Sequence, residues 1–176
     1  MVFRRRTGSD ALAARACRYT GALVLFAMTP VSSPIITHSA EETIAFGRAL
    51  AAELCPPLVV LLCGDLGAGK TTLVKGIAEG FQAASRDQVT SPTFTLVHEY
   101  RSPRAVLYHI DLYRIDTERE LETLGLDDLL APNSILLIEW GEKFPRLRRD
   151  RDMEITLERV KDELGESKRR IRRTTR

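Results

Sequence analysis

Cysteine is scarce in this sequence, and the positions of the few cysteines exclude two classes of small protein. Among the 176 residues there are three cysteines, Cys17, Cys55 and Cys63, and no Cys-x-x-Cys pair. An odd number of cysteines at these spacings argues against a disulfide framework and against a zinc site. We therefore expect reduced thiols and a cytoplasmic protein.

Long hydrophobic runs are also missing. No apolar run approaches the roughly 20 residues that a membrane-spanning helix needs, so we expect no membrane partner. The apolar residues 21–28 follow an arginine-bearing stretch and only faintly resemble a signal or transit peptide. We predict that residues 1–33 are a leader, which is either disordered or, if Met28 is the true start, not part of the native protein.

Acidic residues are nearly absent from both ends. Residues 1–33 hold five arginines and one aspartate, and residues 168–176 hold six basic residues and no acid. Since the whole chain has a formal charge of +2, residues 34–167 carry −8. This acidic body argues against a DNA partner, whereas the basic tail at 163–176 could lie on RNA or on an acidic partner. We favour a solvated, disordered tail, because like charges repel.

What the chain does contain is an alternation of helix and strand patterns. Ser39, followed by Glu41 and Glu42, is typical of a helix start, and this helix should end before Pro56. The apolar residues 58–63 predict a strand that is buried on both faces. Further helix patterns occur at 70–81, 118–124 and after Glu142, and further strand patterns at 94–100, 106–113, 135–140 and 153–160.

A phosphate-binding loop is the strongest motif. Residues 64–71, GDLGAGKT, match G-x-x-x-x-G-K-[ST] between the predicted strand and the predicted helix. In such a loop the backbone N–H groups and the helix N-terminus hold phosphate oxygens, Lys70 reaches the β- and γ-phosphates, and the Thr71 hydroxyl binds Mg²⁺. We predict that ATP or another triphosphate and Mg²⁺ bind here. The predicted nucleotide-binding residues are Asp65, Leu66, Gly67, Ala68, Gly69, Lys70, Thr71 and Thr72.

These patterns together predict the fold. Alternating strands and helices favour an α/β architecture, and the hairpin expected between 94–100 and 106–113 makes the sheet mixed. We predict one domain at residues 34–162 with a P-loop NTPase-like fold of three layers, in which a mixed, mostly parallel sheet is flanked by helices.

A P-loop site also needs an acid at the end of a neighbouring strand. Asp111 and Glu139 each follow an apolar run, and the sequence does not rank them. His109 shares a strand face with Asp111, and we favour a packing or hydrogen-bonding role for it over catalysis.

Two further residues have open interpretations. Thr93 lies in a loop after the P-loop helix, where it could ligate Mg²⁺ and sense the γ-phosphate or simply cap a turn into a strand. The residues alone favour the cap. Trp140, the only tryptophan, could stack on a nucleotide base or pack at the site.

The ordered set of motifs resembles the bacterial TsaE (YjeE) family. The segments that carry the resemblance are GDLGAGKTT, SPTFTLVHEY, YHIDLYRI, LGLDDLL and IEW, which lie between residues 39 and 160. The resemblance implies an Mg²⁺-dependent ATPase, slow in isolation, that works with TsaB and TsaD to install the threonylcarbamoyl group on adenosine 37 of tRNA. It implies contact with tRNA only indirectly, through that complex.

The resemblance also implies roles for single residues. Lys70 and the glycine-rich loop match the family's nucleotide loop, and Thr71 matches its Mg²⁺-binding threonine. Thr93 matches the switch-like threonine, which raises it above a simple cap. Asp111 resembles the family's catalytic or water-positioning acid, and Glu139, beside Trp140, its Mg²⁺-associated acid. Gly141 departs from the pattern, since the family often has proline there.

Two alternatives remain open at this point. A small-molecule P-loop kinase would need an arginine-bearing lid, for which Arg101, Arg104 and Arg114 are available. A nucleotide-dependent binding module would need no hydrolysis. A GTPase is disfavoured, because the chain has no Asn-Lys-x-Asp motif.

Overall fold

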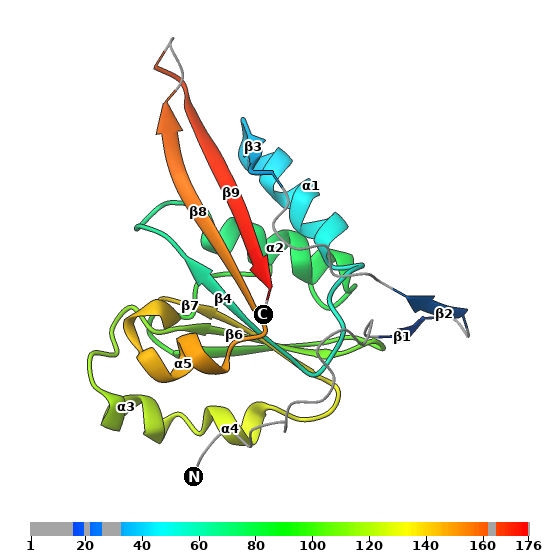
Figure 1. Ribbon diagram of the computed structural model, residues 1–176, viewed down its shortest axis with the longest axis vertical. Coiled ribbons are helices and arrows are strands. Elements are labelled where there is room, and N and C mark those ends of the chain that lie inside the picture. Colours follow the sequence, from blue (N-terminus) through cyan, green and yellow to red (C-terminus); the bar gives the residue numbers. More distant parts are fainter. Residues whose placement is uncertain (1–15, 20–21, 26–32, 162–164, 176) are drawn as a thin grey trace.

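Seven strands form one mixed sheet in the computed structural model, which describes residues 16–19, 22–25, 33–161 and 165–175. The order across the sheet is β3-β9-β8-β4-β7-β6-β5 (Figure 1). The strands are β3 Ile35–Thr37, β4 Leu58–Cys63, β5 Val97–Arg101, β6 Val106–Asp111, β7 Ser134–Glu139, β8 Met153–Lys161 and β9 Ser167–Thr175.

The centre of the sheet is parallel and its two edges are antiparallel. β4 pairs in parallel with both β7 and β8, and β6 pairs in parallel with β7. Every residue of β4 and of β7 is buried, which explains why these two strands are apolar almost throughout. The predicted hairpin is confirmed, since β5 pairs antiparallel with β6.

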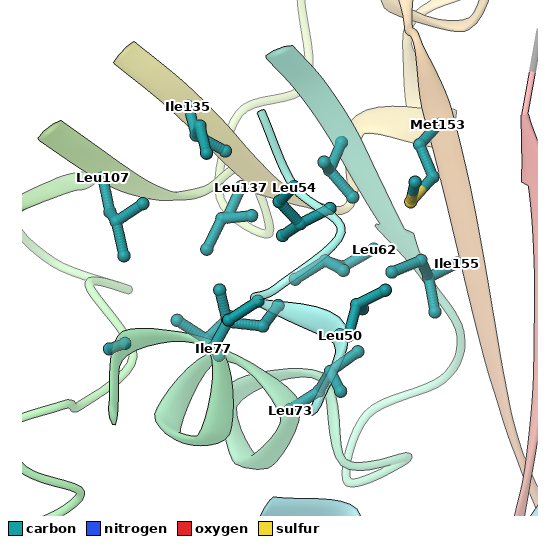
Figure 2. Close-up of a cluster of buried hydrophobic side chains, with 14 of the residues drawn as sticks. Leu50, Leu54, Leu62, Leu73, Ile77, Leu107, Ile135, Leu137, Met153 and Ile155 are labelled. Atoms are coloured by element: carbon teal, nitrogen blue, oxygen red, sulfur yellow. The ribbon is translucent and has the colours of Figure 1, made fainter. Parts of the chain in front are cut away.

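Helices cover both faces of this sheet. α1 Ala40–Leu50 and α2 Lys70–Gly80 lie on one face; α3 Glu118–Thr123, α4 Leu126–Leu129 and α5 Pro145–Asp150 lie on the other, with a short 3-10 helix, η1 Gly141–Lys143, before α5 (Figure 1). One buried cluster joins α1 and α2 to the sheet, as Figure 2 shows with Leu50, Ile77 and Leu137. A second cluster, which contains Leu121 and Leu147, fills the opposite face. These three layers are the predicted ones.

The helix that begins the domain starts as its sequence predicts. The Ser39 hydroxyl accepts a hydrogen bond from the N–H of Glu42 at 3.0 Å, which satisfies one of the open donors of α1. α1 then packs directly on α2, where a Cβ on Gly76 would lie 2.1 Å from the carbonyl oxygen of Ile44. Glycine at position 76 therefore lets the two helices approach closely. None of the helices in the described part of the chain is long and apolar enough to cross a membrane.

The prediction of a disordered basic tail is wrong. Residues 167–175 form β9, which pairs with β8 from Met153↔Thr175 to Lys161↔Ser167 and with β3 on its other side. The physical reason is Ile171, which is 1% exposed in the cluster under α1 and α2. Acidic partners for the neighbouring arginines, among them Glu53 for Arg173, reduce the charge repulsion that the sequence suggested.

The segment predicted to be a leader contains structure that its sequence does not predict. β1 Ala16–Tyr19 and β2 Ala22–Leu25 pair as a two-stranded antiparallel sheet. The rest of the leader prediction, including Met28 as a start, lies outside the described residues.

One predicted strand begins later than expected. The run at 94–100 becomes a strand only at Val97, because residues 93–96 form a turn. Leu96 has a φ of 65°, and its N–H donates to the carbonyl of Pro92 at 2.6 Å. The turn leaves Phe94 86% exposed.

Candidate nucleotide-binding site

A cavity of about 530 Å³ opens at the edge of the sheet where the parallel strands end. Its walls come from the loop before α2, the ends of β6 and β7, the start of α1 and the β8–β9 hairpin. This volume lies within the usual range of small-molecule sites, roughly 300–1,000 Å³. The predicted residues Lys70, Thr71, Thr93, Asp111 and Glu139 all line it.

The loop before α2 has a backbone that only glycine adopts readily. Gly64 has a φ of 135°, and a Cβ there would lie 2.2 Å from the carbonyl oxygen of Leu157. Gly69 has a φ of 106° and occupies the N-cap of α2, where no side chain satisfies the helix N–H groups. These open donors and the positive end of the helix dipole make the loop suitable for an anion.

Lys70 is buried in this loop, and no carboxylate among the described residues is its hydrogen-bond partner. Its side-chain Nζ donates to the carbonyls of Gly64 at 2.6 Å and Asp65 at 3.1 Å, and it lies 3.9 Å from the centre of the Trp140 ring. Burial lowers the pKa of Lys70, an effect that the nearby carboxylates, Glu139 foremost, oppose. A buried ammonium group held by carbonyls and a ring face fits an anionic ligand such as a phosphate chain.

Glu139 receives two hydrogen bonds on one oxygen. Thr71 Oγ1 donates to Glu139 Oε1 at 2.8 Å, and His109 Nε2 lies 2.9 Å from the same oxygen. Because a carboxylate oxygen accepts, Nε2 carries the proton, and the buried Nδ1 of His109 has no hydrogen-bond partner among the described residues. The hydrogen-bonding role predicted for His109 is confirmed.

Asp111 lies directly across from Glu139 in the register of β6 and β7, yet it has different partners. Its Oδ2 accepts from Ser91 Oγ at 2.5 Å and from Thr93 Oγ1 at 2.9 Å, and its Oδ1 accepts from the N–H of Tyr113 at 3.0 Å. Thr93 is thus brought to the site through Asp111. The structure separates the two acids that the sequence could not rank, since Glu139 contacts the P-loop threonine and Asp111 contacts the loop at 91–93.

Trp140 packs against the P-loop lysine. The residue has a φ of 63°, and its ring contacts Tyr113 at 5.2 Å between centroids as well as the ammonium of Lys70. Because Lys70 is the residue expected to reach the outer phosphates, this position favours the packing interpretation over base stacking.

Two arginines that line the pocket are not among the residues predicted from the sequence. Arg169 of β9 lines the pocket, and its Nη2 donates to the carbonyl of Gly67 at 3.5 Å. Arg159 of β8 lines the same wall. Arg169 lies on the same face of β9 as the buried Ile171, but one apolar residue within a run of basic ones does not predict a strand, so the sequence alone does not place Arg169 in the pocket.

The kinase-lid interpretation is not supported at two of its three arginines. Arg104 lies over the ring of Phe81 and donates to the carbonyl of Ala51, and Arg101 pairs with Glu99. Both residues flank the turn between β5 and β6. This turn precedes the start of β6, whereas Asp111 is at the other end of that strand, and neither arginine lines the pocket.

Comparisons with known proteins identify the family of this chain. The family model described as threonylcarbamoyl adenosine biosynthesis protein TsaE matches residues 37–171. The chain is 39% identical over 136 residues to the tRNA threonylcarbamoyladenosine biosynthesis protein TsaE of Rickettsia bellii (strain RML369-C), covering 77% of this chain and 93% of the relative. It is 40% identical over 127 residues to the protein of the same name from Bacillus subtilis (strain 168), covering 72% of this chain and 78% of that relative.

A solved structure is similar over most of the chain. The crystal structure of Bacillus subtilis YdiB matches with a TM-score of 0.61 and 33% sequence identity, and the match covers 82% of this chain and 86% of that chain. This likeness confirms the predicted fold class.

Proposed function

The chain belongs to the TsaE family and is involved in tRNA threonylcarbamoyladenosine biosynthesis, and we propose that its part is to bind ATP with Mg²⁺ and hydrolyse it. The observation that carries the proposal is the contact between Thr71 Oγ1 and Glu139 Oε1 beside the buried Lys70. It joins the P-loop hydroxyl, the lysine and a strand-end carboxylate in one pocket, as triphosphate chemistry requires.

Thr71 and Glu139 are the residues that would hold Mg²⁺. Both present oxygen, the ligand type that this hard ion prefers, and they already lie 2.8 Å apart. When bound, the ion would neutralise charge on the phosphate oxygens. His109 holds the Glu139 carboxylate in its orientation through the hydrogen bond between Nε2 and Oε1.

Lys70 and the loop backbone would hold the phosphates. The N–H groups at the start of α2 point to the ligand, and the Lys70 ammonium would exchange its carbonyl partners for phosphate oxygens. Buried at 4% exposure, its charge acts in a medium that screens it less than water does.

Asp111 is the residue that we assign to orienting water for attack on the γ-phosphate. Ser91, Thr93 and the N–H of Tyr113 hold its carboxylate at 3% exposure, so its position is fixed before substrate binds. Thr93 would couple nucleotide binding in the pocket to the conformation of the turn at residues 93–96. Its hydroxyl could also be a ligand of Mg²⁺.

The expected partners are TsaB and TsaD, with tRNA reached through their complex in the cytoplasm. Support for a covering partner comes from two exposed apolar side chains near the pocket, Leu66 at 73% and Phe94 at 86% exposure. A partner that covers them would exclude water from the site and speed a slow isolated ATPase.

Phosphate release from ATP tests this proposal. The chain should release phosphate slowly with Mg²⁺, faster with TsaB, TsaD and tRNA, and not at all after Lys70→Ala. Glu139→Gln should raise the Mg²⁺ concentration required. ATP binding without turnover in every mixture would favour a nucleotide-dependent binding module instead, and turnover only with an added metabolite would favour a kinase.

A further inference from the structure

The β8–β9 hairpin has one face that points away from α1 and α2, which we term the outer face. Side chains alternate along a strand, so the buried Ile171 places Lys168, Arg170 and Arg172 on the opposite side of β9. Across from them in β8, the register places Val160, Glu158 and Thr156 respectively. Figure 1 shows the hairpin extending beyond the helices α3, α4 and α5. Arg172 is exposed and the other five side chains are half-buried, so the outer face is a partly exposed sheet surface.

This face is cationic on an otherwise acidic body. Arg170 and Arg172 both pair with Glu158, so one carboxylate is shared by two guanidinium groups. Their side chains remain 42% and 48% exposed, and Lys168 adds a third positive charge to the row. Residues 34–167 carry −8 by contrast. An anionic partner would thus be attracted to this strand and repelled by the acidic body at residues 34–167.

The chemistry of the outer face favours a phosphate backbone over an acidic protein. Protein interfaces depend on large apolar or aromatic anchors, and Val160 is the one apolar side chain among the six in this row. Phosphate contacts need no such anchor, and the planar fork of arginine matches phosphate oxygens in a bidentate manner. Basic side chains on alternate residues lie roughly 7 Å apart along a strand, so the row can follow a nucleic-acid backbone.

We propose that the outer face of the β8–β9 hairpin binds the phosphate backbone of tRNA directly, in addition to the indirect contact expected through TsaB and TsaD. This inference goes beyond the proposed ATPase function and does not rest on it. Arg169, on the inner face of the same strand, contacts the P-loop at Gly67, so the RNA surface and the nucleotide pocket lie on opposite faces of β9. Both can be occupied at the same time.

The test is the salt dependence of tRNA binding by the full chain. Fluorescence anisotropy with labelled unfractionated tRNA, measured across a series of KCl concentrations, gives the affinity and its salt slope. Removing two phosphate contacts in Arg170→Gln/Arg172→Gln should reduce the slope of log K against log[KCl] by roughly 1.5 and weaken binding by about tenfold or more. The matched control is Arg48→Gln/Arg86→Gln, because these arginines share Glu79 as Arg170 and Arg172 share Glu158.

A variant that gains affinity for tRNA shows that the loss in the arginine variants is not caused by misfolding. Glu158→Gln removes the acid that the two arginines share, so tRNA should bind several-fold more tightly with a steeper salt slope. Lys70→Ala should lose ATP binding and keep tRNA binding, which separates failure of this inference from failure of the ATPase proposal. Equal effects of the two arginine pairs, or no salt-dependent tRNA binding, would overturn the inference. So would tighter binding of polyglutamate than of tRNA at this face, which would identify an acidic protein as the partner.

Discussion

At the scale of single residues, His109 and Thr71 both form hydrogen bonds with the same oxygen of Glu139, Oε1. His109 is fully buried and its Nδ1 has no partner among the described residues, so its Nε2 contact is what the side chain contributes. Residues behind a metal ligand commonly change metal affinity by about 10–100-fold when they are removed. We therefore treat His109 as a positioning residue.

Replacing His109 with leucine should raise the Mg²⁺ concentration that half-saturates ATP binding by about tenfold. The variant loses the donor to Glu139 and leaves the carboxylate with Thr71 alone, while ATP binding without Mg²⁺ should change little. Because Trp140 contacts Lys70, its fluorescence can follow the titration. His109→Gln, whose amide can still donate, is the control and should retain more of the affinity. A leucine variant with the Mg²⁺ requirement of the original protein would show that His109 has only a packing role.

At the scale of helices and strands, the sequence predicted elements whose signals are local. As predicted, Ser39 caps α1, the apolar residues of β4 are buried, and α2 begins directly after the glycines of the P-loop. The prediction for the segment that forms β9 is wrong because the signal for this strand is not local. Five basic residues surround Ile171, and only the pairing with β8 and β3, together with burial of that one side chain, makes a strand of them. Tertiary contacts here outweigh the repulsion within the charge run.

The contact between α1 and α2 has a pH dependence that can be tested. A hydrogen bond from Arg48 holds the pKa of Glu79 below its ordinary value of 4.5, and Arg86 adds to this effect. The folded pKa is lower than the unfolded one, so the stabilisation is fully present above pH 4.5 and is lost as the pH falls through the folded pKa.

Glu79→Gln should therefore lower the free energy of unfolding at pH 7 by about 0.5–1 kcal/mol, the upper range for exposed pairs. Urea unfolding at pH 7 and at pH 3 checks this, and the difference between the variant and the original protein should shrink at pH 3. A difference that stays constant or grows on acidification would contradict the assignment.

At the scale of the whole molecule, the site is assembled from segments far apart in the sequence. The nucleotide loop was predictable because its motif is contiguous, and Asp111 and Glu139 were predictable as candidates because each ends a strand. Which partner each acid contacts was not predictable from the sequence. Thr71 and Glu139 are 68 positions apart, and Asp111 and Thr93 meet only through the turn before β5. Arg169 reaches the P-loop across 102 positions, a contact that only the folded sheet defines.

The most direct test of the central claim is single-turnover hydrolysis of Mg²⁺-ATP by Asp111→Asn. Asn keeps the shape of the side chain but has no negative charge and one acceptor oxygen in place of two, so it orients water poorly, and Glu139, Thr71 and Lys70 are untouched. We predict that this variant binds ATP and Mg²⁺ with an affinity close to that of the original protein, while the rate of phosphate formation falls by about 100-fold or more. An unchanged rate of phosphate formation would contradict the claim that this pocket hydrolyses ATP through Asp111.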